Sequence, residues 1–290
     1  MEYFLNLVAN GVVIGATYGM TAMAFALIYK ATGVVNFAQG EVMMLVAYVA
    51  YSLASALGWS FGPLMLIVVP AAMATGFLIE RLFIRPMLGE PVFSIVMVTI
   101  GLAVIIRGVV ALIWGTQPVD FTAGFTTDVI HIGPVPFYEV QLYAVGAMGL
   151  LVAGAWAFFR FTRMGIAMRA TANNETAALL MGIPVARVYA VAWSLAAGVS
   201  AIVGVIFSAM FSLGPDLWFQ GLKAFPAVIV GGLDSVLGAA IGGLVIGVVE
   251  NLAEGYIGQG LKEIAGFVVI VLVLMIRPYG LFGQKEIERV

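Results

Sequence analysis

The stretch "MTAMAFALIYKATGVVNFAQGEVMMLVAYVAY", Met20–Tyr51, sets the fold class. Two long apolar runs flank a short polar segment, Gly33–Glu41, which holds two amides and a carboxylate within six residues. Such runs are typical of membrane spans, because about 20 apolar residues in a helix cover ~30 Å of hydrocarbon. The polar segment is either a water-facing turn or a group of side chains inside the protein, and the rest of the chain bears on that choice.

The composition excludes a water-soluble domain. The 290 residues are 63% hydrophobic and 10% charged, with a mean hydropathy of +1.11, whereas soluble domains carry roughly 25% charged residues. We therefore predict an all-α, polytopic helical membrane protein, with about eight or nine transmembrane or re-entrant helices in one bundle and a single transmembrane domain over residues 1–290. The predicted apolar runs are Leu5–Tyr29, Val42–Leu57, Leu64–Leu82, Phe93–Trp114, Leu142–Phe159, Val188–Leu213, Leu237–Val249 and Ile264–Ile276.

The placement of basic residues predicts the orientation. They gather in 81–85, 160–187 and 277–289, whereas 115–138 contains no Lys or Arg. The positive-inside rule makes the basic clusters cytoplasmic and 115–138 an external loop. Nine passes would put the N-terminus outside and the C-terminus inside. The orientation of the C-terminus stays open, because Lys223, Pro226 and Asp234 interrupt the apolar pattern after Leu217. Whether 217–232 crosses or re-enters the membrane is also open.

The chain lacks the residues of a catalytic or metal site. It has no cysteine and a single histidine, His131, and it carries no P-loop or nucleophile motif. We expect no enzyme activity, no metal site, no cofactor in this chain and no nucleic-acid partner. Energy for transport would come from a gradient or from another subunit.

Few charges fall within the apolar runs. Arg107 lies in the middle of a predicted span, with no acidic residue within a helical turn. A charge at that depth faces the bundle interior or water, so Arg107 is either a gate or partner contact, or an arginine that extends along a tilted helix to the interface. Glu80 and Arg81, adjacent at a helix end, indicate a water-facing rim.

The segment Phe159–Ser194 predicts a capped amphipathic helix between two spans. Asn173 or Asn174 can serve as the N-cap, Thr176–Met181 forms the body, and Gly182 ends the helix. Such a helix lies on anionic lipid or docks into a groove of a soluble partner.

The segment "TAALLMG", Thr176–Gly182, has the spacing of the Glu-Ala-Ala-x-x-x-Gly loop through which ABC importer permeases contact their ATPases. More of the chain resembles the LivH-type permeases of branched-chain amino-acid ABC importers. The matching segments are "GATYGMTAMAFALIYKATGVVNFAQGEVMML", "GIAMRATANNETAALLMGI", "LKAFPAVIVGGLDSVLGAAIGGLVIGVVEN" and "RPYGLFG".

The resemblance implies a multi-pass protein of the cell inner membrane. It implies a second homologous permease, two ATP-binding cassette subunits that bind ATP, and an external solute-binding protein that delivers leucine, isoleucine or valine. The cytoplasmic coupling loop would be 160–187. The implied ATPase-coupling residues are Arg163, Arg169, Thr176, Ala177, Ala178 and Gly182.

Three departures from the family pattern limit what can be carried over. Gln39 stands where the family usually has His, and Thr176 replaces the acidic first residue of the loop. Asp234 stands where a small residue is common, in the turn of the interrupted helix. A permease for urea, short amides or other amino acids remains an alternative. A gradient-driven secondary carrier or a structural membrane protein remains a further one, although the chain has no acidic cluster at the midplane for a coupling ion. The candidate pathway or gate residues are Asn36, Gln39, Glu41, Arg107, Lys223 and Pro226.

Overall fold

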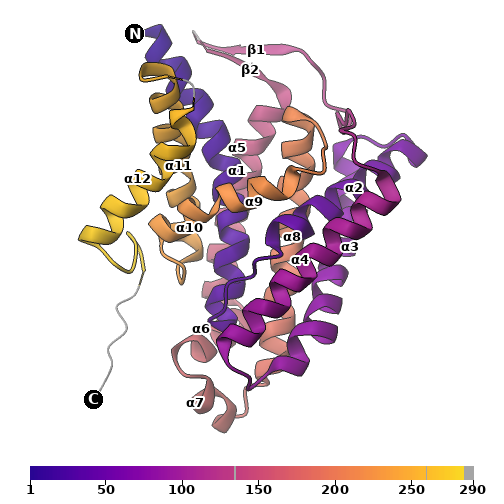
Figure 1. The fold of residues 1–290 in the computed structure, drawn as a ribbon, viewed down its shortest axis with the longest axis vertical. Helices are drawn as coiled ribbons and strands as arrows, with labels where there is room; N and C mark the ends of the chain where they lie inside the picture. The colour runs from indigo at the N-terminus through magenta and orange to yellow at the C-terminus, as the bar shows by residue number, and fades with distance from the viewer. Residues whose placement is uncertain (134, 259, 284–290) are drawn as a thin grey trace.

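A computed structural model describes residues 1–133, 135–258 and 260–283. Most of this chain is helical, and Figure 1 shows the helices gathered in one bundle. In chain order the elements are α1 (Glu2–Thr32), α2 (Gln39–Leu57), α3 (Phe61–Ile79), the π-helical turn η1 (Glu80–Ile84), the 3-10 turn η2 (Arg85–Met87), α4 (Val92–Trp114), β1 (Val129–Ile132), β2 (Val135–Tyr138), α5 (Glu139–Phe161), α6 (Arg163–Asn173), α7 (Glu175–Leu180), α8 (Val185–Phe211), α9 (Leu217–Lys223), α10 (Phe225–Gly231), α11 (Val236–Tyr256) and α12 (Leu261–Ile276).

The predicted class of a polytopic helical membrane protein is confirmed. Within the described residues, seven helices are long and apolar enough to cross a membrane, and Leu217–Gly231 and Ile264–Ile276 are shorter apolar segments. Seven and two make nine candidate segments, which agrees with the predicted eight or nine. Each predicted apolar run coincides with one of these segments, although Val188–Leu213 continues two residues past the end of α8 at Phe211. The other helices extend a few residues past most of the predicted ends.

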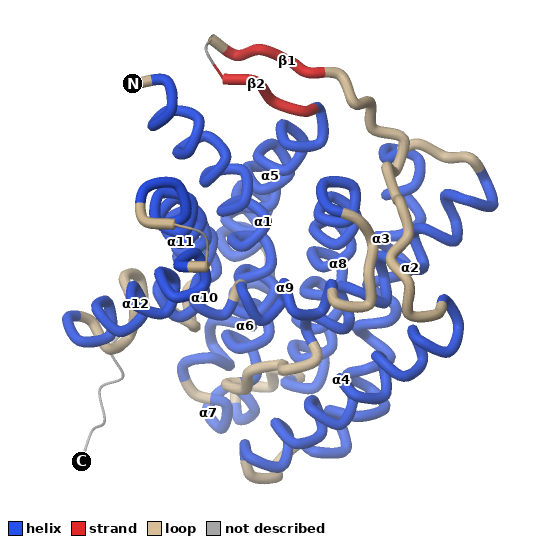
Figure 2. Tube along the Cα trace, turned by 45° about the horizontal axis from the view of Figure 1, so that its top comes forward, coloured by secondary structure: helices blue, strands red, loops and turns tan. Residues whose placement is uncertain are grey.

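The bundle has two distinct ends. Residue 1 and the β1–β2 hairpin lie at one end, called here the hairpin end, and α6 and α7 lie at the other, called the α7 end (Figures 1 and 2). The hydroxyl of Tyr3 donates to the carbonyl of Gly255 at 2.9 Å, whereas Lys30 Nζ donates to the carbonyl of Asp234 at 2.8 Å. These contacts join both ends of α1 to both ends of α11, so the two helices run antiparallel along the length of the bundle.

Close glycine contacts hold α1 against α11. A Cβ atom added to Gly11 would lie 2.7 Å from Val248 Cα, and one added to Gly15 would lie 2.8 Å from the carbonyl oxygen of Gly243. The hydrophobic effect contributes little to the association of helices in lipid, so close backbone packing at small residues supplies much of the attraction. Gly11, Gly15 and Gly19, spaced four residues apart in α1, therefore allow the close contact between α1 and α11.

The interrupted segment 217–231 connects the end of α8 to the turn that contains Asp234. Leu213, just before it, pairs through its backbone with Val119 at the hairpin end. The turn that follows α10 contains Asp234, which Lys30 reaches at the α7 end. Figure 1 shows α9 lying across the middle of the bundle. The two short helices thus form a broken apolar segment that is shorter than each of the seven candidate spans.

Two local features differ from the sequence-based expectations. The loop 115–138 contains the antiparallel β1–β2 hairpin, which was not predicted. The water-facing rim predicted at Glu80 is wrong, because Glu80 is fully buried and accepts two hydrogen bonds from Arg85, at 3.1 and 3.0 Å. The π-helical turn explains the contact, since it brings residues five apart into register. Lys285 and Arg289 of the predicted basic tail lie outside the described residues.

Candidate functional site

The polar stretch that follows α1 turns into the bundle. Gly33 ends α1 with a positive φ of 66°, a conformation that glycine adopts without strain. The chain then runs without helix until α2 begins at Gln39. The side chain of Gln39 donates to the hydroxyl of Ser200, which lies near the middle of α8. The second helix therefore starts halfway along the bundle. The polar segment Gly33–Glu41 thus places its side chains inside the protein and is not a water-facing turn.

The two amides form one buried network. Asn36 and Gln39 are each 1% exposed. Asn36 Nδ2 donates to Gln39 Oε1 at 3.0 Å, and Asn36 Oδ1 accepts from the backbone N–H of Ala38 at 3.0 Å. Residues 34–38 are not helical, so the two amides do not share the face of a helix. The amides nevertheless meet, since the turn at Asn36 brings the two side chains together.

Glu41 and Arg107 form an ion pair between two helices. Glu41, in the first turn of α2, is 2% exposed, and its Oε1 lies 3.1 Å from Arg107 Nε of α4. The Nε contact is electrostatic rather than an aligned hydrogen bond. The guanidinium also lies over the ring of Trp218, 4.0 Å from its centroid, in cation–π geometry. Arg107 therefore finds its partners inside the bundle instead of extending along its helix to an interface.

The start of α2 packs directly on the interrupted segment. A Cβ atom added to Gly221 of α9 would lie 2.5 Å from Gly40 Cα, so only glycine fits at this crossing. The ring of Phe37 lies 6.1 Å from that of Phe225, the first residue of α10. Two breaks in the helical pattern, far apart in sequence, thus lie side by side.

The structure brings four of the six candidate pathway residues together and places the other two nearby. Asn36, Gln39, Glu41 and Arg107 surround the start of α2. Lys223, at the end of α9, lies over the ring of Phe219 at 5.2 Å, and Pro226 is buried at the start of α10. Three further members of the site were not predicted, and they are Thr99, Ser200 and Trp218. A single hydroxyl in an apolar span carries no distinguishing signal, but the tryptophan beside an interrupted helix could have been singled out.

At the α7 end the predicted capped helix is confirmed. Asn174, one of the two proposed N-caps, accepts from the backbone N–H of Ala177 at 2.8 Å. The helix runs over Glu175–Leu180, and Gly182 follows it with a φ of 81°. The preceding α6, Arg163–Asn173, has its own cap, Thr162, which accepts from Gly165 N–H at 2.9 Å.

The end of α7 presents apolar side chains to the surroundings. Leu180 is 84% exposed and Met181 is 83% exposed, whereas Ala178 is buried. Arg163 and Arg169 are exposed on α6, as are Thr176 and Ala177 on α7. A small apolar cluster, made by Ala31, Met168, Val185, Val188, Tyr189 and Ala192, anchors α6 to α1 and α8. The exposed pair Leu180 and Met181, called here the α7 tip, is the typical make-up of an interaction surface, and it was not predicted.

A polytopic bundle with a buried polar site at mid-depth and an exposed helix at one end is the architecture of a membrane transport permease. The chain matches the family "Branched-chain amino acid transport system / permease component" over residues 7–276, and it belongs to that family. It is a multi-pass membrane protein.

Two relatives and one solved structure illustrate the similarity. The high-affinity branched-chain amino acid transport system permease protein LivH of Escherichia coli K12 is 32% identical over 99% of this chain and 98% of its own length. The corresponding protein BraD of Pseudomonas aeruginosa is 29% identical, with the same coverage. The structure of PsaBC from Streptococcus pneumoniae in complex with Fab has a TM-score of 0.51 at 12% identity, and covers 96% of this chain and 93% of that chain. This last similarity is one of fold.

Proposed function

We propose that this chain is a permease subunit of an ABC importer that carries branched-chain amino acids across the cell inner membrane. The observation that carries the proposal is the α7 tip, two exposed apolar side chains on a capped helix at the end of the bundle, in a chain that belongs to this permease family. An apolar helix end of this kind fits a groove of a soluble partner.

The partners follow from that assignment. An ATP-binding cassette subunit would receive the α7 tip, with Arg163 and Arg169 beside it. A second homologous permease would complete the pathway, a second ATPase would lie beneath that permease, and an external solute-binding protein would deliver the amino acid at the hairpin end. ATP would be bound by the partner subunits alone.

The cluster at the start of α2 is proposed as the gate. Glu41 comes from α2, Arg107 from α4 and Trp218 from α9, so relative movement of any one of these helices separates the ion pair or uncovers the guanidinium. Opening the pair is costly for Glu41, because this buried carboxylate then loses its cation in a medium of low dielectric constant. Such a contact favours two discrete arrangements of the helices over a continuous range of them. Alternating access requires two such discrete arrangements.

Reconstitution tests the proposal. The permease is placed in vesicles with its partner permease and ATPases, and uptake of labelled leucine, isoleucine, valine, alanine and urea is measured with the binding protein present. We expect uptake of the three branched-chain amino acids that depends on both ATP and the binding protein. Uptake of urea or alanine alone would assign the alternative substrates, and uptake driven by a proton or sodium gradient without ATP would refute the importer.

A further inference from the structure

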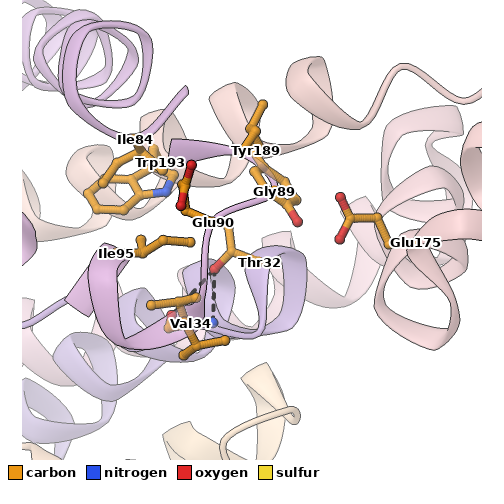
Figure 3. Close-up of a pocket in the computed structure, with 11 residues that line it drawn as sticks. Thr32, Val34, Ile84, Gly89, Glu90, Ile95, Glu175, Tyr189 and Trp193 are labelled. Atoms are coloured by element: carbon orange, nitrogen blue, oxygen red, sulfur yellow. Dashed lines mark hydrogen bonds between the residues drawn. The ribbon is translucent and has the colours of Figure 1, made fainter. Parts of the chain in front are cut away.

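Two cavities open at the α7 end, and their linings carry opposite charge. The first is lined by parts of α1, α4, α7 and α8, and Figure 3 shows Glu90 and Glu175 on opposite sides of it, with Tyr189 between them. Glu175 already interacts with Tyr189. The second cavity has a volume of about 420 Å³ and lies between the end of α5, α6 and the start of α11. Its lining residues are Trp156, Phe159, Arg160, Arg169 and Leu237.

The second cavity, called here the arginine cavity, carries more positive than negative charge. Arg160 and Arg169 are exposed, and within the described part of the chain neither forms an ion pair or a hydrogen bond. Lys30 lies beside them, with Nζ 5.5 Å from the centroid of the Phe159 ring. Asp234 attracts Lys30, whereas Arg169 repels it. Asp234 therefore offsets one of three positive charges, and the cavity attracts an anion.

Aromatic rings hold the guanidinium of Arg160 in place. It lies 5.3 Å from the centroid of the Trp156 ring and 5.7 Å from that of the Phe161 ring. The two rings pack edge to face on each other, with centroids 5.5 Å apart. A guanidinium that lies over a ring keeps its N–H groups free at its edge, and these groups match the oxygens of a phosphate. Arg160 is thus oriented before any anion binds.

The outer face of α5 suits an acyl chain. Exposed positions recur three or four residues apart at Val145, Gly149, Ala153 and Trp156, and this line ends at Arg160. Only 11% of the most apolar stretch of α5 is buried inside the chain, the smallest share among the seven candidate spans. Tryptophan is enriched where a helix leaves the hydrocarbon for the headgroup layer, and basic pockets between helices bind anionic headgroups. An apolar line that leads to a cationic end matches the polarity of an anionic phospholipid.

We infer that the arginine cavity binds the phosphate of an anionic phospholipid in the leaflet at the α7 end. The phosphate accepts hydrogen bonds from Arg160 and Arg169, and an acyl chain lies along the outer face of α5 toward Val145. Because the two arginines belong to α5 and α6, the bound phosphate holds α6 against the end of α5. An acidic segment of a protein partner would also meet the arginines, but its carboxylates alone would leave the apolar line of α5 uncovered.

Native mass spectrometry of the full-length chain tests the site. The delipidated protein is titrated with phosphatidylglycerol or phosphatidylcholine in one detergent. We expect tight binding of phosphatidylglycerol and weaker binding of phosphatidylcholine, because the arginines repel its choline group. Arg160→Gln and Arg169→Gln should each weaken the tight binding about fivefold, which corresponds to the ~1 kcal/mol that one basic residue contributes beside an anionic membrane surface. Arg160→Lys keeps the charge and should lose less affinity than Arg160→Gln.

Arg81→Gln is the matched control for the loss of one positive charge. Arg81 is an exposed arginine of η1 and does not line the arginine cavity, so this variant should bind phosphatidylglycerol as the wild type does. Since Arg160 and Arg169 are also exposed, their replacement should leave the unfolding temperature of the lipid-free protein unchanged. Added phosphatidylglycerol should raise the unfolding temperature of the wild type and not that of the Arg160→Gln, Arg169→Gln double variant.

Several results would overturn the lipid site. They are equal binding of the two lipids, unchanged binding in both single glutamine variants, and a loss in Arg81→Gln equal to theirs. Displacement of the lipid by inorganic phosphate at the same concentration would make the cavity a site for a free anion. Displacement of the lipid by a partner subunit in the purified complex would make it a protein contact. Each of these results leaves the importer assignment standing, because uptake is measured separately.

Discussion

The Glu41–Arg107 pair has unequal partners, and this predicts unequal effects of mutation. The side chain of Glu41 is 3% exposed, whereas that of Arg107 is 39% exposed and also lies over the Trp218 ring. Arg107→Gln leaves a buried carboxylate without its cation, a change that typically costs about 3–5 kcal/mol. Glu41→Gln leaves a cation that keeps its ring contact and part of its hydration. The loss of protein stability should therefore be smaller than in Arg107→Gln. The measurement is the thermal unfolding of the purified variants in one detergent.

An exposed ion pair serves as the control for that comparison. Glu254 and Lys262 lie 2.9 Å apart, with side chains 40% and 27% exposed. Such pairs contribute about 0–1 kcal/mol, so Glu254→Gln should leave the unfolding temperature almost unchanged. A loss in Glu41→Gln equal to that in Arg107→Gln would show that burial of the carboxylate is not the deciding factor.

Gln39 should tolerate histidine better than leucine. Its amide both accepts from Asn36 and donates to Ser200. Gln39→Leu removes both functions and leaves the two partners buried, at a cost of about 1–3 kcal/mol for each unsatisfied group. Neutral histidine has one donor and one acceptor nitrogen and can supply both contacts. We expect Gln39→His to retain ATP-driven uptake and stability while Gln39→Leu loses both. A histidine variant as unstable as the leucine variant would contradict this role of the amide.

For individual residues, the sequence predicted which side chains belong to the candidate site but not which of them contact one another. The polar segment 36–41 and the isolated Arg107 were both identifiable, because charges and amides stand out in apolar surroundings. Their contact was not, since no periodicity relates residues on different helices. Glu80 was misjudged for a related reason. Its contact with Arg85 depends on a π-helical turn, which spaces residues by five and leaves no mark in an apolar pattern.

Among the elements, α7 carries the clearest prediction. The double variant Leu180→Asp with Met181→Asp places two charges on the α7 tip without touching the core, because both side chains are more than 80% exposed. We expect normal insertion in the membrane and loss of copurification with the partner ATPase. Gly182→Arg should act in the same direction, since it adds bulk beside the tip and strain at a φ of 81°. The measurement is ATPase retained on the tagged permease after solubilisation.

The matched control for α7 lies on the opposite end of the molecule. Ile132 of β1 is 54% exposed in the hairpin, so Ile132→Asp changes an exposed apolar residue far from the tip and should retain the ATPase. Unchanged copurification in the Leu180 and Met181 double variant would remove the coupling assignment. Deletion of Thr176–Met181 tests the same point with a larger change.

The long helices and the capped helix were predictable, and the hairpin was not. Apolar runs of span length and the Asn-to-Gly boundary of α7 are local signals. The strands Val129–Ile132 and Val135–Tyr138 are four residues each, and Pro136 lies within the second. Two strands this short, with proline in one, give too little alternation for a strand prediction.

For the whole molecule the structure fixes which segments share an end. Residue 1 and the hairpin lie at one end, and α6 and α7 lie at the other (Figure 1). The basic residues of 160–187 fall at the α7 end, whereas 115–138 has none. By the positive-inside rule we expect the α7 end to lie in the cytoplasm. This arrangement predicts an odd number of crossings between residue 1 and α6.

The chain has no cysteine, so single cysteines can report the two ends directly. Glu2→Cys and Thr127→Cys, both at exposed positions near the hairpin end, should react with a membrane-impermeant maleimide added to intact cells. Asn173→Cys, exposed at the end of α6, should react only after the membrane is opened. Leu213→Cys, whose position is fully buried, controls for specificity and should stay unlabelled in both conditions. Five helices lie between positions 2 and 173, and they are α1, α2, α3, α4 and α5. Five crossings put the two positions on opposite sides of the membrane. Labelling of both from the same side would require an even number of crossings and would refute this topology.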